Sequence, residues 1–147
     1  MKKTLFFIAV LFFTATIQLQ AAHVIYYVST TGNDNNNPCT QTTPWQTIQK
    51  ALGECNDPLN NTYEIRVERG TYSIRNALVL TQKTKLTGGY DKTFTISSPG
   101  LYSYIEPIGG YLGSLMDATN PAIGSSSEVE NFRFRRANCS NNNVNIS

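Results

Sequence analysis

The 147-residue chain has one histidine, His23, and three cysteines, Cys39, Cys55 and Cys139. A single histidine near a chain end offers no nucleophile–base pair for acyl transfer. No Cys-x-x-Cys pair occurs, which argues against a zinc site, and no glycine-rich motif has the context of a phosphate-binding loop. These absences leave no catalytic residue to name, and no metal or cofactor is evident.

Long apolar runs are equally scarce, because the only one extends from Leu5 to Phe13. Two lysines precede it, and Ala21 and Ala22 follow it, which is the layout of a secretory signal peptide over residues 1–22. The run is shorter than the roughly 20 apolar residues that cross a bilayer. We therefore expect a cleaved signal rather than an anchor, a secreted or cell-surface protein, and no membrane span in the mature chain.

Charged residues make up only 15% of the chain, with 12 basic and 10 acidic residues. Removal of Lys2 and Lys3 with the signal leaves 10 basic and 10 acidic residues, so the mature chain is neutral. A neutral chain lacks the excess positive charge that nucleic-acid binding requires. We expect no nucleic-acid partner.

Export would place the cysteines in an oxidising compartment, which permits them to form disulfides. Cys39 and Cys55 flank one predicted helix, so we expect them to pair, which would stabilise the fold by roughly 3 kcal/mol. Two free thiols are the alternative. Cys139 is left over, either free or paired with a residue outside this chain.

One helix is expected, in the segment TPWQTIQKALG, with Thr43 as N-cap and Gly53 as the C-terminal stop. Trp45, Ile48 and Leu52 fall on one face at helical spacing. A short helix with a single apolar face is suited to lie as a cap on a flat layer.

Short apolar stretches follow at intervals of about ten residues, a spacing typical of an antiparallel sandwich or a parallel β-helix. No Asn-Gly or Asp-Gly hairpin turn occurs, which disfavours the sandwich. We expect an all-β solenoid whose first coil is covered by the helix. The predicted strands cover residues 23–29, 63–67, 77–80, 84–87, 94–96, 101–105 and 129–134. In the second of these, Tyr63, Ile65 and Val67 alternate with Glu64 and Arg66, which predicts one buried face and one face toward water. Gly88 and Gly89 are expected to end the strand at residue 87.

Three stretches, YYVSTTGNDNNNPCTQTTPWQTIQKAL, EIRVERGTYS and LTGGYD, carry a resemblance that covers roughly residues 25–91. They resemble the N-terminal segment of secreted right-handed parallel β-helix proteins with a pectate-lyase-like fold. The resemblance implies a strand, loop and capping helix over residues 23–62. The first coils would follow over residues 63–147, with an irregular excursion around 107–127. Family members are longer, so we expect a fragment of a longer solenoid.

The resemblance is specific for fold rather than chemistry. In the lyases of this family, acidic residues hold calcium and an Arg or Lys acts as base on central coils, so calcium is expected only if the chain belongs to an enzyme. Arg133, Arg135 and Arg136 are interpreted as outward basic residues. Tyr102, Tyr104 and Tyr111 are candidate sugar contacts, because an amphipathic ring offers a face and a hydroxyl. Packing between coils is the alternative role.

Two functions follow as hypotheses. The first is an exported or cell-surface β-helix protein that contacts polysaccharide or another surface component without catalysis. The second is the N-terminal part of a polysaccharide lyase or glycoside hydrolase. The second rests on fold analogy alone, which is weak evidence for function.

Overall fold

A computed structural model describes residues 21–57, 61–81, 83–95, 97, 99–108, 114–117 and 127–135. The predicted signal segment lies outside these residues, apart from Ala21 and Ala22. Tyr111, Arg136 and Cys139 also lie outside them.

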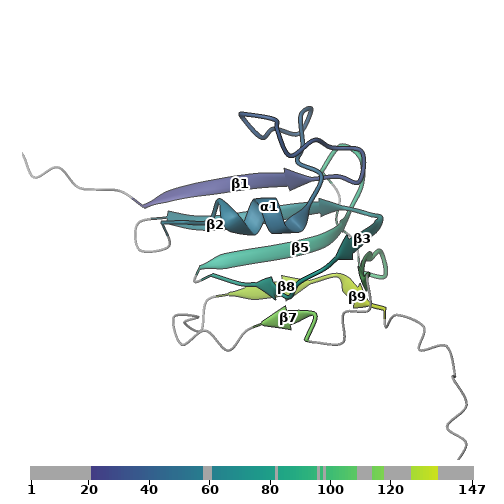
Figure 1. The fold of residues 1–147 in the computed structure, drawn as a ribbon. Coiled ribbons are helices and arrows are strands. Elements are labelled where there is room, and N and C mark those ends of the chain that lie inside the picture. The colour runs from purple at the N-terminus through teal and green to yellow at the C-terminus, as the bar shows by residue number, and fades with distance from the viewer. Residues whose placement is uncertain are drawn as a thin grey trace, which may run out of the picture.

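Three parallel sheets make up most of the described chain (Figure 1). Every ladder between the named strands is parallel, so the all-β prediction is confirmed and the pairing is not that of an antiparallel sandwich. Sheet A contains β1 (Ala22–Val28), β2 (Asn61–Glu68), β5 (Thr84–Tyr90) and β8 (Glu128–Glu130). Sheet B contains β3 (Thr71–Ile74), β6 (Ser103–Pro107) and β9 (Phe132–Phe134), and sheet C contains β4 (Leu78–Val79) and β7 (Met116–Asp117).

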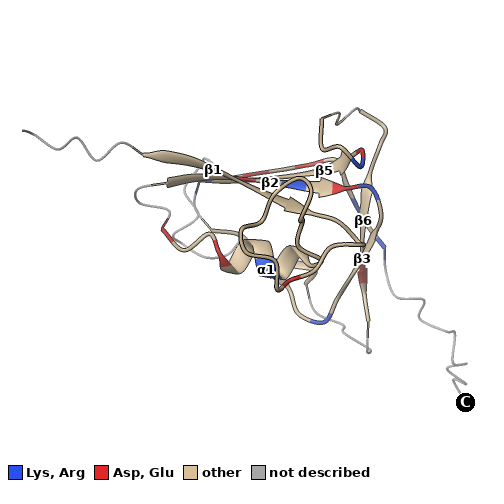
Figure 2. Cartoon of the chain, turned by 90° about the horizontal axis from the view of Figure 1, so that it is seen from above, with Lys and Arg blue, Asp and Glu red and all other residues tan. Residues whose placement is uncertain are grey.

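From β2 onward the chain visits the sheets in a repeating order, A, B, C, A, B, C, A, B. Figure 2, seen from above, shows sheets A and B as two sides that meet at a corner, with α1 facing sheet A. Within each sheet, neighbouring strands follow the order of the chain, so a strand is hydrogen-bonded to the strand that precedes it in that sheet. The regular spacing of strands in the sequence therefore corresponds to successive strands that lie in sheets A, B and C in turn.

The core lies between the sheets, and the period-two pattern of β2 determines which side chains enter it. Tyr63, Ile65 and Val67 are buried, whereas the alternate residues Glu64 and Arg66 lie on the outer face. Parallel pairing places Ile65 beside Leu86, which is also fully buried. Because side chains alternate along a strand, in-register pairing stacks inward residues on inward residues.

The helix is shorter than predicted: α1 comprises Ile48–Gly53 and is capped by Thr47, whose hydroxyl accepts the Lys50 amide. The prediction of Thr43 as N-cap is wrong, because the helix begins after Thr47, and Asp34, in the preceding loop, accepts hydrogen bonds at its start. Its carboxylate accepts the amide of Thr47 at 2.9 Å. α1 buries Ile48, Ala51 and Leu52 and packs against β1, β2 and β4.

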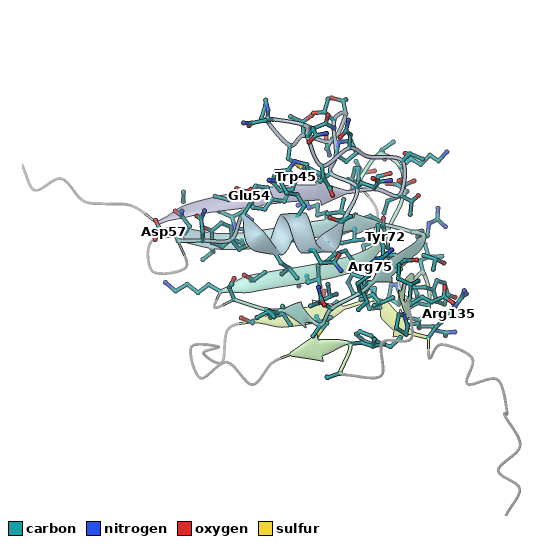
Figure 3. The ribbon with its side chains drawn as sticks, in the orientation of Figure 1. Trp45, Glu54, Asp57, Tyr72, Arg75 and Arg135 are labelled. Carbon is teal, nitrogen blue, oxygen red and sulfur yellow. The ribbon has the colours of Figure 1, made fainter. Side chains whose placement is uncertain are left out.

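Trp45 does not lie on the helix, contrary to the prediction. It forms a one-residue parallel bridge with Val28 at the free edge of β1 (Figure 3). Its amide donates to the carbonyl of Tyr27 at 2.9 Å, and its indole donates to the carbonyl of Asn36 at 2.7 Å. The tryptophan is buried because the backbone pairing carries it onto the edge strand.

Three strand predictions are corrected. Residues 129–134 form two strands in different sheets, since Asn131 has a φ of 58° and turns the chain between them. Phe94 is buried in a turn with a φ of 53° rather than in a strand. The expected excursion around 107–127 contains β7, which pairs with β4.

The predicted disulfide between Cys39 and Cys55 is not formed in the structure, where both thiols are free. Each thiol instead hydrogen bonds to a nearby main-chain carbonyl, Cys39 to Tyr27 and Cys55 to Ala51. Burial raises the pKa of the Cys55 thiol to about 12, which keeps it protonated and unreactive.

Val67 and Val79 provide a matched test of the core. Val67 is fully buried, whereas Val79 is 47% exposed. We expect Val67→Ala to lower the free energy of unfolding by about 2–3 kcal/mol, since two buried methyl groups are lost and a cavity remains. Val79→Ala should change it by less than about 0.5 kcal/mol. Urea unfolding of both variants measures the difference, and equal effects would contradict this inside–outside assignment.

Candidate functional site

A groove of about 600 Å³ lies on the outer face of sheet A, across β2, β5 and β8. Parallel pairing places Glu64 beside Lys85 and Lys85 beside Glu128. We call this feature the sheet A groove. Its walls include Glu64, Lys85, Thr87, Tyr90, Glu130 and Asn131.

Two glycines bring the end of β5 into the groove. A Cβ at Gly88 would lie 2.6 Å from the carbonyl oxygen of Asn131, and one at Gly89, with a φ of 75°, would lie 2.2 Å from that of Leu101. Only glycine allows such approaches. The pair had been expected to end the strand at residue 87, but β5 continues to Tyr90. An irregularity in the β2–β5 register then pairs Tyr90 with Glu68.

Glu64 is the centre of one wall. Its carboxylate accepts hydrogen bonds from Arg66 Nε at 2.8 Å and from the Tyr90 hydroxyl at 3.3 Å, and His23 Nε2 lies 3.3 Å away. The Arg66 guanidinium lies 5.6 Å from the centre of the Tyr90 ring. The hydrogen bond from Arg66 is the main cause that lowers the pKa of Glu64, against the opposing effect of burial.

Lys85 lies on β5, between Glu64 of β2 and two glutamates of β8. Its ammonium lies 3.0 Å from a carboxylate oxygen of Glu130 and 3.2 Å from one of Glu128. These hydrogen bonds, that to Glu130 first, raise the pKa of Lys85. Nearby, the Asn131 side-chain amide donates to the Ser97 hydroxyl at 2.9 Å. This side of the groove therefore presents carboxylate, amide and hydroxyl groups.

Thr87 is the exception in this network. The residue is 3% exposed, yet its hydroxyl has no hydrogen-bond partner among the described residues. Buried polar groups are nearly always paired, and an unpaired one requires an explanation. Thr87 lines the sheet A groove but its hydroxyl oxygen is itself buried, so a hydroxyl-bearing ligand or water in the groove can supply the partner once the side chain rotates toward it.

The charge states favour binding over proton transfer. The lowered pKa of Glu64 keeps it ionised, and the raised pKa values of Arg66 and Lys85 keep them protonated. Burial also raises the pKa of Tyr90, so its phenol stays neutral. A general acid or base needs a pKa near the working pH, and these shifts move each group away from it.

The predicted sugar contacts lie elsewhere. Tyr104 is on β6 in sheet B and Tyr102 directly precedes that strand, while Tyr111 is outside the described residues. The guanidinium of Arg133 lies 4.1 Å from the centre of the Tyr102 ring, and that of Arg135 lies 4.0 Å from that of Tyr104. One face of each ring is therefore occupied by a cation. A sugar contact by these tyrosines stays a prediction.

The described part of the chain contains no group of three or more His, Cys, Asp or Glu side chains arranged as metal ligands. It also contains no helix of the length and apolarity that crossing a bilayer requires.

Sequence reasoning did not identify the groove residues. Glu64 and Arg66 were predicted to lie on a wet strand face, which is confirmed, but their convergence with Tyr90 depends on the irregular register. The only local feature of the sequence that points to the groove is Thr87, a polar residue immediately before Gly88 and Gly89.

Comparisons with known proteins identify no relative: no protein-family model matches the chain, and no curated protein or solved structure is significantly similar to it. The resemblance to β-helix proteins therefore stays a prediction, and function must be argued from the groove itself.

Glu64 should make stability depend on pH. Its folded-state pKa lies below the ordinary value of 4.5, so its contribution is complete above that pH and is lost as pH falls through the folded-state pKa. We expect Glu64→Gln to cost about 1–2 kcal/mol at pH 7. The gap from wild type should close in acid. Thermal melts from pH 7 to pH 2.5 (acid limit about two units below the ordinary pKa) measure it. The control is Glu54→Gln at the residue after α1, whose ion pair with Lys50 is exposed and therefore weak.

Thr87 and Thr84 separate a binding hydroxyl from a structural one. Both residues are buried on β5, but the Thr84 hydroxyl lies 2.8 Å from that of Thr81. We expect Thr84→Val to lower the free energy of unfolding by about 1–2 kcal/mol, because its partner is left unpaired. Thr87→Val should be neutral or stabilising. Chemical unfolding tests this, and a similar loss in both variants would show that Thr87 has a structural partner.

Proposed function

We propose that this chain is an exported or cell-surface protein with a right-handed parallel β-helix fold, and that its sheet A groove binds polysaccharide without catalysing a reaction. Two lines of support exist, one for the fold and one for the groove.

The fold proposal is supported by the repeating order of the three sheets. Each circuit adds one strand to sheet A, one to sheet B and one to sheet C, and all ladders between named strands are parallel. In-register neighbours such as Ile65 and Leu86 form successive inward layers. A coiled ribbon has these properties, because each coil buries its core against adjacent coils.

The groove proposal rests on one observation, the buried and unpaired hydroxyl of Thr87 in a groove rich in polar groups. Sugar hydroxyls both donate and accept, so they match a wall that offers carboxylates, an amide and a threonine hydroxyl. Binding sites combine a few convergent polar groups with an apolar or aromatic surface. Tyr90 supplies an aromatic ring beside Glu64.

The alternative is the N-terminal part of a polysaccharide lyase or glycoside hydrolase. Its support is the presence of two carboxylates, Glu64 and Glu130, in one groove. A glycosidase needs one carboxyl group with a raised pKa as general acid, whereas Arg66 lowers the pKa of Glu64. This shift disfavours Glu64 as the general acid, and calcium would be relevant only if the enzyme alternative holds.

Binding of neutral glycans to the mature full chain tests the proposal. A panel of soluble neutral polysaccharides can be screened by affinity electrophoresis, and a binding glycan can then be titrated by calorimetry. We expect Thr87→Val to weaken binding about tenfold, the value of one hydrogen bond. Thr62→Val, on the same face but outside the groove wall, should retain wild-type affinity.

The result is informative in either direction. Unchanged affinity in Thr87→Val would remove the groove from the binding site. Release of unsaturated products from a uronate polymer with added calcium would favour the lyase alternative over a binding protein.

A further inference from the structure

The outer face of sheet B carries two arginines stacked on two tyrosines. Arg133 lies on β9 and Arg135 follows it, and the Arg135 amide continues the β6 ladder by donating to the carbonyl of Ile105 at 2.8 Å. Their guanidinium groups lie 4.1 and 4.0 Å from the ring centres of Tyr102 and Tyr104. We call these four residues the arginine ladder.

The arginine ladder has an excess of positive charge, with two arginines against one glutamate, Glu106, on the same face. Within the described residues, neither Arg133 nor Arg135 has a carboxylate within 4.0 Å, although Glu106 lies on the same face of β6. Both arginines are exposed. On sheet A, by contrast, Arg66 and Lys85 are each paired with glutamates. In Figure 2, blue and red lie together along sheet A, and on the sheet B side blue marks the last described residues while β6 carries red.

Stacking also pre-organises the ladder. A guanidinium held over an aromatic ring gains cation–π attraction and loses freedom before a ligand arrives. Its planar fork of N–H donors can then accept two oxygens of one anion. Residues two apart on a strand are separated by roughly 6.5 Å, so Arg133 and Arg135 present two such forks in a row. Figure 3 shows Arg135 on the side of the molecule away from Asp57.

The surroundings favour a hydroxylated polymer over a nucleic acid. Single-stranded nucleic acids stack their bases on open aromatic faces, whereas guanidinium groups lie over Tyr102 and Tyr104. Thr71 and Ser73 are exposed on β3, the neighbouring strand, and Thr71 is in register with Tyr104. The face thus combines fixed cations with a row of hydroxyls.

The chemistry of the anion follows from hydration. A guanidinium is more weakly hydrated than an ammonium, and weakly hydrated cations pair best with weakly hydrated anions. Sulfate esters fit this description better than carboxylates, which hold water tightly. We propose that the arginine ladder binds the sulfate ester groups of a polysaccharide. This site is separate from the sheet A groove and does not depend on it.

The experiment measures binding of the mature full chain to three polymers with one backbone: dextran, carboxymethyl dextran and dextran sulfate, the last two at equal substitution. Wild type should bind dextran sulfate most tightly and dextran, which carries no anion for the ladder, least tightly. We expect Arg133→Gln with Arg135→Gln to weaken dextran sulfate binding at least tenfold, because each fork makes charge-assisted hydrogen bonds. The double lysine variant should bind with intermediate affinity, since it keeps the charge and loses the fork.

Two controls separate the ladder from general charge and from the groove. Lys92→Gln removes an exposed cation that follows sheet A and should change the affinity by less than about twofold, the size of an incidental surface effect. Thr87→Val should leave dextran sulfate binding unchanged while it weakens neutral glycan binding. Circular dichroism melts of all variants verify that they are folded.

Three results would overturn the inference. They are equal affinity of wild type and the double glutamine variant, tighter binding of carboxymethyl dextran than of dextran sulfate, and tighter binding of a single-stranded polynucleotide than of either acidic dextran.

Discussion

Parallel, in-register pairing between β2 and β5 is the constraint on which the rest of the structure depends. It places Ile65 beside Leu86 on the inner face and Glu64 beside Lys85 on the outer face. A shift by one residue would exchange the two sets and bury the charged pair. Because burial of unpaired charge is costly, the alternation in β2 fixes the register of the sheet and, with it, the composition of the outer surface.

The outer surface then divides into two kinds of face. On sheet A, each described cation lies beside a glutamate, and the groove is lined by two glutamates, Glu64 and Glu130, and one lysine, Lys85. On sheet B, Arg133 and Arg135 lie over aromatic rings instead of carboxylates. The first arrangement suits hydroxyl groups, and the second suits anions.

Close backbone packing links the two faces. Gly88 and Gly89 let the end of β5 approach Leu101 and Asn131, which lead into β6 and β9. Asn131 turns the chain from sheet A into sheet B and also donates its side-chain amide to Ser97. A side chain at either glycine would separate these segments. The turn that completes the groove is therefore the turn that places Arg133 on sheet B.

Much of the fold was predictable from local patterns. The alternation of Tyr63, Ile65 and Val67 predicted a half-buried strand, and the missing hairpin turns predicted non-antiparallel pairing. The helix was predicted in the right place but too long, because Asp34 caps it from a distant loop position. The candidate tyrosines were chosen for their chemistry alone. Nothing in the sequence indicated that arginines about 30 residues later would cover Tyr102 and Tyr104.

By itself the sequence determined the class of structure and the faces of its strands, since hydrophobic period and turn residues act over a few neighbouring positions. Only the tertiary structure decided which outward residues meet. The unpaired hydroxyl of Thr87, the network around Glu64 and the arginine ladder all depend on contacts between strands of successive circuits, and their register is set by the whole stack rather than by any one segment.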